Sequence, residues 1–491
     1  MDRRNIGDLE LDAVGFTLRR THERGSASLS DQLLQQLRQR LAQASPGSRL
    51  PSTRALAQAL GVSRNTVLRA YERLSDEGHV QGQRGGGSRV RLPPPASAQH
   101  APARKSALPL RWSGLPAPQI RPWPARAFRT GLPPLDLFPF EDWARLQRQT
   151  WRRAERGELQ LGYAHPAGEP RLREQIALWL RHGRGLPCTP EQVVVTSGAQ
   201  QGMALAALAL LAPGDLALCE SPGYASAWAA LQLSGARVMG LPVDAAGLRP
   251  QALQALRGGR LVMVTPAHQW PTGVTLGLER RLDLLAWAQR EQAWVLEDDY
   301  AGEYRFEGTP LPPLASLDRA GRCIHIGSFS KLLLPGLRLG YLVLPADLVD
   351  EFARLRLALD RHAPQIEQEV LAEFIEQGQL ARHLRRARRA AAQRREALQQ
   401  AWKRAFGDRL PLQAPPSGLN ACVPLTAPAQ EQRLLAAARA AGVEMGGLNE
   451  LLRTCAQPGA RSGLLLGFGG TPPAEIEGAV ATLARVWTAL A

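Results

Sequence analysis

A proline-rich stretch near the start of the chain divides it into two unequal parts. Residues Pro93–Pro109 read PPPASAQHAPARKSALP, with small residues and no apolar periodicity. Such a composition favours an extended linker over a packed element. We therefore predict a short module over residues 1–92, a linker over 93–110 and a large module over 111–491. A chain of 491 residues has room for about two to four domains.

Composition excludes several classes of protein. The longest apolar run, Met203–Ala212, is about half of a membrane span. The first residues, MDRRNIGDLELD, are mixed in charge and lack the apolar core of a signal peptide, so we expect a cytoplasmic protein. Five cysteines are widely spaced, without CxxC and without a histidine at metal-ligand spacing. We expect reduced thiols and no metal site.

Positive charge is concentrated at the N-terminus. The net charge is +16, and the stretch Met1–Lys105 holds 17 basic and 9 acidic residues. Between Gln32 and Tyr71 there are six arginines and no acidic residue. A dense basic stretch favours a polyanionic partner, although a solvated basic face would look the same by charge alone.

The same region has the periodicity of three helices and a hairpin. Leu29–Ala44 is amphipathic, and Ser52 or Thr53 can cap a helix that runs to Leu60. Ser63 can cap a third helix, which places its apolar residues inward and leaves its first turn, Arg64 to Thr66, exposed. Two short strands, Val80–Gln83 and Ser88–Arg91, flank a glycine-rich tip.

This order predicts a helix-turn-helix with a wing. Its third helix would present Arg64 and Thr66 to base edges, because arginine reads guanine and threonine suits phosphate or thymine. The stretch RLPSTRALAQALGVSRNTVLRAYERLSDEGHV with GGGSRV resembles the winged helix-turn-helix of GntR-type bacterial regulators over about Ser28–Leu92. The resemblance implies an operator in double-stranded DNA and the DNA contacts Arg54, Ser63, Arg64, Thr66, Gly85 and Gly86. A helical hairpin that binds protein is the alternative.

The large module alternates short apolar runs with helical patterns. The runs are Val193–Val195, Leu216–Cys219, Leu261–Val264, Trp294–Leu296, Cys323–Ile326 and Tyr341–Leu344. This alternation predicts βαβ units and a mainly parallel sheet. A long arginine-rich helix over Gln379–Phe406 precedes a smaller β/α unit, with Leu464–Phe468 as a strand and a last helix near Pro473–Ala489.

Four motifs follow predicted strands in this module. SGAQQG places a Ser-Gly turn at a helix start, where N–H groups can hold an anion. WVLEDDY ends a strand with carboxylates and a phenol, and PGY places Tyr224 at a strand mouth. SFSKLLLPGLRLGY contains Lys331, one of only three lysines in the chain, beside Lys105 and Lys403.

Together the motifs suit pyridoxal 5′-phosphate. Its aldehyde needs an amine for a Schiff base, which Lys331 can supply, and its ring nitrogen needs a buried carboxylate, for which we favour Asp298 over Asp299. Tyr300 can donate to the ring oxygen and Tyr224 can stack on the ring. The predicted phosphate ligands are Gly198, Ala199, Gln200, Ser328, Ser330 and Arg338.

The large module resembles fold-type I aminotransferases over about Arg111–Ala491. With its N-terminal part, the chain resembles the MocR/GabR class of regulators. The predicted fold is therefore a winged helix-turn-helix (α+β) followed by an α/β transferase fold of type I, which depends on pyridoxal phosphate, with a small C-terminal α/β subdomain. The resemblance implies the residue roles just given, a homodimer and Lys331 as the catalytic residue.

One position departs from ordinary aminotransferases. Their NPTG asparagine, which contacts the ring oxygen, is replaced by Trp270 in the stretch Thr265–Gly273. Efficient transamination is therefore not expected, unless His268 or Gln269 takes the role. For the carboxylate of an effector, Arg453 and Arg461 are both candidates.

We expect a transcriptional regulator that senses pyridoxal phosphate, or an amine or amino acid that reacts with it. Its target genes would belong to vitamin B6 or amine metabolism. The alternative is an active aminotransferase with an accessory DNA-binding module. A vitamin carrier fits neither the recognition helix nor the basic charge.

Overall fold

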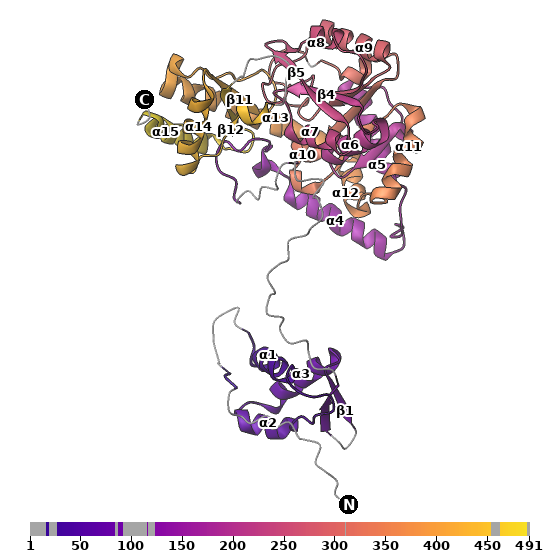
Figure 1. The fold of residues 1–491 in the computed structure, drawn as a ribbon, viewed down its shortest axis with the longest axis vertical. Helices are drawn as coiled ribbons and strands as arrows, with labels where there is room; N and C mark the ends of the chain where they lie inside the picture. Colours follow the sequence, from indigo (N-terminus) through magenta and orange to yellow (C-terminus); the bar gives the residue numbers. More distant parts are fainter. Residues whose placement is uncertain are drawn as a thin grey trace, which may run out of the picture. The chain divides into compact units, whose positions relative to one another are not determined.

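The computed structural model describes residues 16–18, 27–83, 87–91, 115, 123–309, 311–452 and 462–488. It divides the chain into two compact units, Met1–Ser113 and Gly114–Ala491 (Figure 1). The linker predicted over 93–110 lies outside the described residues, so the domain limits stay predictions. Each unit is described by itself below.

Three capped helices and a two-stranded wing make up the N-terminal unit. They are α1 (Leu29–Leu41), α2 (Thr53–Leu60), α3 (Arg64–Asp76), β1 (Val80–Gln83) and β2 (Gly87–Val90). The hydroxyls of Ser28, Ser52 and Ser63 accept first-turn N–H groups of α1, α2 and α3, which satisfies donors that a helix start leaves free. Gly61, with φ +62°, ends α2 and makes the tight turn into α3.

An apolar core and two ion pairs join α1 to α3. Leu33 and Leu37 of α1 pack with Val67 and Leu74 of α3, all fully buried. Arg38 pairs with Glu77, and Arg73 of α3 pairs with Asp31 of α1. These pairs are partly exposed, so their contribution to stability is small and the core dominates. The predicted winged helix-turn-helix is confirmed.

An eight-stranded sheet forms the centre of the C-terminal unit. Its order is β3 (Val193–Thr196), β10 (Gly340–Val343), β9 (Cys323–Ser328), β8 (Trp294–Asp298), β7 (Gly259–Val264), β4 (Leu216–Ser221), β5 (Arg237–Asp244) and β6 (Gly247–Leu248). Neighbouring strands from β9 to β5 are parallel, whereas β10 is antiparallel to both β9 and β3. The sheet is thus mainly parallel, as predicted.

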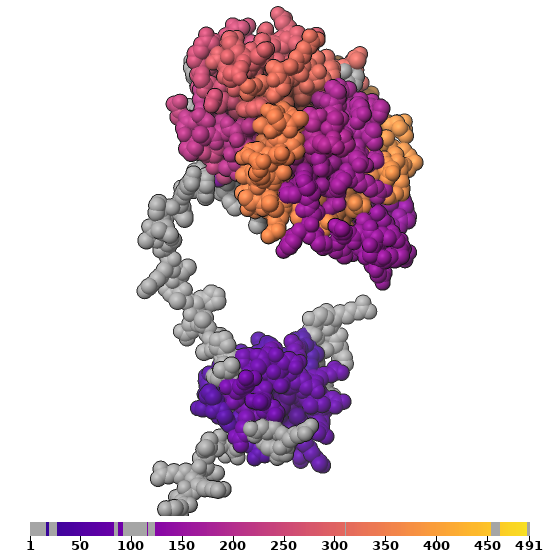
Figure 2. Space-filling view, turned by 90° about the vertical axis from the view of Figure 1, so that its right-hand side faces the viewer, coloured from indigo at the N-terminus to yellow at the C-terminus, as the bar shows by residue number. Residues whose placement is uncertain are grey.

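Helices cover both faces of this sheet (Figure 1). They are α4 (Phe140–Glu155), α5 (Pro170–Arg184), α6 (Ala199–Leu210), α7 (Ala225–Gln232), α8 (Pro250–Gln254), α9 (Leu278–Glu291), α10 (Phe329–Leu332), α11 (Val349–Leu359) and α12 (Gln365–Glu376). Val193 and Val195 join the apolar cluster of α5 and α12, while Val194 joins the cluster of α6 and α7. This alternation is the period of two that a strand requires. Figure 2 shows the α4–α5 region and residues near 350–400 side by side on one face.

A smaller subdomain follows the sheet. It contains α13 (Gln379–Phe406), β11 (Asn420–Leu425), α14 (Pro428–Ala440), β12 (Gly446–Gly447), β13 (Ser462–Gly467) and α15 (Pro473–Thr488). The second half of α13 packs on α15 through Trp402, Phe406 and Trp487. In the part of the chain that the structure describes, no helix is long and apolar enough to cross a membrane.

Candidate cofactor site and DNA-binding surface

The antiparallel strand β10 brings distant motifs of the C-terminal unit together. Its first residue, Gly340, pairs with Thr196 at the end of β3 and with Ser328 at the end of β9. On the other side of β9, Asp298 pairs with Ile326. The Ser-Gly turn, the lysine segment and the end of WVLED therefore lie at one edge of the sheet.

The turn after β3 forms a cradle with Arg338. Gly198 precedes α6 with φ +87°, and no side chain caps the helix. The first-turn N–H groups of α6, which include those of Ala199 and Gln200, have no acceptor within the helix. A Cβ on Gly198 would stand 3.3 Å from Nη1 of Arg338, whose Nη2 donates to the Ser197 carbonyl at 2.8 Å. The positive helix end and the guanidinium thus face the same space.

Two hydroxyls lie at the next strand end. Ser328 is buried, caps α10 and accepts the N–H of Ser330 at 3.2 Å. Because Ser328 pairs with Gly340, which in turn pairs with Thr196, this cap borders the Gly198 turn. The structure therefore gathers all six predicted phosphate ligands around the ends of β3 and β9.

Lys331 lies on α10, with its amine directed to a segment far away in the sequence. Its Nζ donates to the carbonyl of Gly131 at 2.6 Å. Burial lowers the pKa of Lys331 to about 8, because a charged amine loses hydration there, and the negative charge of Asp298 opposes this shift. About a tenth of the amine is therefore unprotonated at pH 7, far more than for an ordinary lysine.

Asp298 is a buried carboxylate with an unused acceptor. It is 4% exposed, and its Oδ1 has no hydrogen-bond partner among the described residues. Burial raises the pKa of Asp298 to about 7, and the neighbouring Asp299 raises it further. Asp299 itself forms a buried ion pair with Arg184. Of the two aspartates, Asp298 is the one without an ion-pair partner among the described residues.

Aromatic rings line the space beside Asp298. Trp270 lies edge-on to Tyr300 and to Tyr224, with ring centroids 6.0 and 6.3 Å away. The centres of the His268 and Tyr300 rings are 5.8 Å apart. The Tyr300 hydroxyl is buried without a partner in the described part of the chain, and burial raises its pKa well above the usual value. The Tyr300 hydroxyl is therefore a neutral donor that can serve a bound acceptor.

The two residues that precede Trp270 have different environments. Gln269 donates from Nε2 to Glu220, to the Pro222 carbonyl and to the Trp270 carbonyl, and its Oε1 accepts from Thr272. No free donor remains on Gln269. His268 keeps Nε2 without a described partner, while Nδ1 meets the Ser417 hydroxyl at 3.2 Å. Burial lowers the pKa of His268 to about 4, so the ring is neutral.

Sequence reasoning missed two groups of this site. The Gly131 carbonyl contacts Lys331 across 200 residues of sequence, and no local pattern marks it. Glu220 is the next-to-last residue of β4, and burial raises its pKa to about 7 although Thr265 donates to it twice. A carboxylate at the end of an apolar strand was the signal that selected Asp298, and it could have selected Glu220 as well.

The N-terminal unit places its predicted DNA contacts on the first turns of α2 and α3. The Ser63 hydroxyl meets the Thr66 hydroxyl at 2.8 Å and accepts the Thr66 N–H at 3.1 Å, so both side chains hold the start of α3. Arg64 Nε donates weakly to Thr53 Oγ1, at 3.4 Å, which joins the two helix starts. Arg54 and Arg64 are exposed.

The charge of this surface is not neutralised by the described residues. Asp31 and Glu77 pair with arginines of the α1–α3 contact, whereas no described carboxylate forms an ion pair with Arg54, Arg64 or Arg49. Arg49, which sequence reasoning missed, lies against the wing, 3.3 Å from where a Cβ of Gly87 would stand. The predicted contacts Gly85 and Gly86, and both carboxylate candidates, Arg453 and Arg461, lie outside the described residues.

Two known protein families match the chain, one in each of the two units described above. Residues 29–90 match the bacterial regulatory proteins of the gntR family, and residues 128–459 match aminotransferase class I and II. The latter match covers more than half of the chain. Among solved structures, LysN, an α-aminoadipate aminotransferase from Thermus thermophilus, is similar with a TM-score of 0.67 and 28% identity, covering 74% of this chain and 92% of LysN. An archaeal alanine:glyoxylate aminotransferase shares the fold, with a TM-score of 0.69, 24% identity and coverage of 74% and 91%.

Relatives that match most of the chain are named as regulators. The probable rhizopine catabolism regulatory protein MocR of Rhizobium meliloti is 37% identical over 449 residues, 90% of each chain. The pyridoxine biosynthesis transcriptional regulator PdxR of Corynebacterium glutamicum is 35% identical over 381 residues, 76% of this chain and 78% of PdxR. The transcriptional regulator TauR of Rhodobacter capsulatus is 37% identical over 367 residues, 72% of this chain and 75% of TauR. With a GntR winged helix-turn-helix before an aminotransferase class I and II domain, this chain belongs to the MocR-type GntR regulators.

Proposed function

We propose that this protein is a transcriptional regulator that binds operator DNA through its N-terminal unit and pyridoxal 5′-phosphate in its C-terminal unit. The proposal rests on two features of one chain. Among the described residues, the exposed arginines at the starts of α2 and α3 form no ion pair, and buried Asp298 Oδ1 and the Tyr300 hydroxyl have no hydrogen-bond partner. The regulator names of MocR, PdxR and TauR support it. Genes of vitamin B6 or amine metabolism are the proposed targets.

The residues present fit the cofactor. Asp298 Oδ1 and the Tyr300 hydroxyl are buried acceptor and donor without partners among the described residues, which match the ring nitrogen and the ring oxygen. The Gly198 turn leaves open the space that a Cβ would fill beside Arg338, which suits a phosphate. When bound, the cofactor supplies an aldehyde that reacts with amines and a ring that withdraws electrons.

Each side chain has a distinct task in this proposal. Arg338, Ser328 and Ser330 bind the phosphate together with the N–H groups at the start of α6. Asp298 holds the proton of the ring nitrogen, and the positive charge there reverses the raised pKa of this carboxylate. Tyr224 stacks on the ring, and Lys331 holds the cofactor and yields to an effector amine.

We further propose that turnover as an aminotransferase is slow. The complete set of Lys331, Asp298 and Arg338 favours some activity, and it keeps the aminotransferase alternative open to test. Trp270 replaces the amide that donates to the ring oxygen in ordinary aminotransferases. His268 is the better substitute, since Gln269 has no free donor.

A homodimer is the proposed assembly. The loop after α4 exposes Leu161 and Tyr163, and the end of α11 exposes Leu359. The two segments adjoin, because the Arg361 guanidinium lies 4.3 Å from the centre of the Tyr163 ring. Exposed apolar side chains gathered in this way favour burial against a second chain. A dimer would present two winged modules to two half-sites.

Lys331 is expected to anchor the cofactor. Pyridoxal phosphate added to the purified protein, followed by borohydride reduction and peptide mapping, should tag the peptide that contains Lys331. Lys331→Ala should remain folded and lose the visible absorbance band of the bound cofactor. A tag on Lys105 or Lys403 would show that the site is assigned wrongly.

The cofactor-free protein is expected to lose stability as pH rises, owing to Asp298. The pKa of this carboxyl is about 7 in the folded protein and near its ordinary value of 3.8 when the chain is unfolded. The folded state therefore binds the extra proton between these values, so the contribution is fully present below pH 4 and is lost by about pH 7. The full change is on the order of 4 kcal/mol.

Asp298→Asn should remove the part of the pH-dependent loss of stability that Asp298 causes. Thermal melting of the cofactor-free proteins from pH 5 to pH 8 should show the wild type falling relative to the variant. The Glu220→Gln variant is measured in parallel, because burial also raises the pKa of the Glu220 carboxyl. Parallel melting curves for wild type and Asp298→Asn would contradict the assigned pKa.

Arg64 is expected to carry operator recognition. Arg64→Ala should weaken specific binding by about 1–3 kcal/mol if it contacts a base pair, and wild-type binding should weaken steeply with salt. Arg73→Ala is the matched control on the same helix, since Arg73 is paired with Asp31. Equal operator affinities for wild type and Arg64→Ala, measured by fluorescence anisotropy, would refute the recognition helix.

A further inference from the structure

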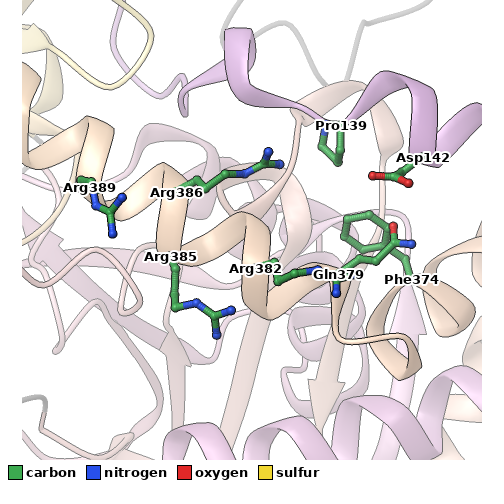
Figure 3. A pocket seen from close by; sticks show the side chains of 8 residues that line it. All are labelled: Pro139, Asp142, Phe374, Gln379, Arg382, Arg385, Arg386 and Arg389. Atoms are coloured by element: carbon green, nitrogen blue, oxygen red, sulfur yellow. The ribbon is translucent and has the colours of Figure 1, made fainter.

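A pocket apart from the cofactor site lies between the start of α4 and the start of α13. Its volume is about 340 Å³. It is lined by Pro139, Asp142, Phe374, Gln379, Arg382, Arg385, Arg386 and Arg389 (Figure 3). None of the residues assigned to the cofactor belongs to this set.

The four arginines of the pocket lack ion-pair partners among the described residues. Elsewhere on α13, Arg394 pairs with Asp136, Arg395 pairs with Glu307, and Arg404 lies near Glu477. The pocket arginines lie within three turns of the helix start, where Gly378 provides no side-chain cap. The free N–H groups of that turn add positive potential. The arginine end of the pocket therefore attracts an anion.

The opposite end of the pocket offers acceptors. Gln379 is 7% exposed, and its Oε1 has no donor in the described part of the chain. Its orientation is fixed, because Nε2 donates to Gln377 Oε1 at 2.9 Å while Gln377 Nε2 donates to Glu373. Figure 3 shows Asp142 at this end and Arg389 at the other. Asp142 contacts Arg145 at 3.2 Å on the exposed side.

We propose that this pocket binds a small zwitterion, an aminoalkyl phosphate or an amino acid, as a second effector site. The anionic group would lie against Arg382 and Arg386, and the ammonium group would donate to Asp142 and Gln379 Oε1. Pro139 and Phe374 would contact the methylene groups between them. A nucleic-acid backbone fits less well, because a phosphodiester has no donor for Gln379 and is repelled by Asp142.

The test is isothermal titration calorimetry on the full-length Lys331→Ala protein freed of pyridoxal phosphate, which holds no aldehyde for an amine to react with. O-phosphoethanolamine is the probe, and ethyl phosphate and ethanolamine each lack one of its charges. We expect O-phosphoethanolamine to bind at least 10-fold more tightly than either. No measurable binding, or equal binding of ethyl phosphate, would overturn the proposal.

Variants locate the site. Arg382→Gln combined with Arg386→Gln should weaken binding of O-phosphoethanolamine at least 10-fold, whereas Arg404→Gln at the far end of α13 should not. Asp142→Asn should remove the preference for O-phosphoethanolamine over ethyl phosphate. These side chains are exposed, and unchanged circular dichroism would verify folding. Unaltered zwitterion binding in the double variant, or a loss confined to DNA affinity, would refute the site.

Discussion

The burial of a carboxylate and an amine at the ends of neighbouring strands is the constraint on which the C-terminal unit depends. Asp298 and Lys331 both have pKa values displaced toward neutrality because water is excluded from them. Neither charge is directly paired with the other by a hydrogen bond in the structure. A bound cation beside Asp298 and a covalent partner for Lys331 would each remove the free-energy cost of burying a charge there. The site therefore favours a cofactor.

The sheet provides this burial and also the anion cradle. Strand β10 runs against its neighbours and sets Gly340 between Thr196 and Ser328, so that two hydroxyls and a helix start share one edge. Arg184 neutralises Asp299 in a buried pair, and we therefore propose Asp298 as the partner of the ring nitrogen of the cofactor. Asp298 and Asp299 are adjacent and chemically identical, but the geometry of the strand ends thus gives them different environments.

Much of this could be predicted from sequence, for physical reasons that also mark the limits. The strands are short apolar runs, and the motifs at their ends are contiguous, so Lys331 and Asp298 were accessible to local reasoning. The helix caps Ser52 and Ser63 follow from hydroxyls placed before apolar periodicity. The Gly131 carbonyl and the Asp142–Arg386 pocket were not accessible, because they join segments about 200 residues or more apart. The arginine run of α13 gives no local sign of a pocket, and only the structure shows that part of this run and the start of α4 line one.

We propose that the occupancy of the cofactor site in the C-terminal unit controls DNA binding by the N-terminal unit. The most direct measurement is footprinting and affinity on DNA upstream of the gene itself, for wild type and Lys331→Ala, each with and without pyridoxal phosphate, alongside mass measurement in solution. We expect a dimer that protects two half-sites, and a cofactor-dependent change in wild-type affinity of about 5-fold or more that Lys331→Ala lacks. A monomer with a single short footprint, unchanged by the cofactor in both proteins, would contradict it.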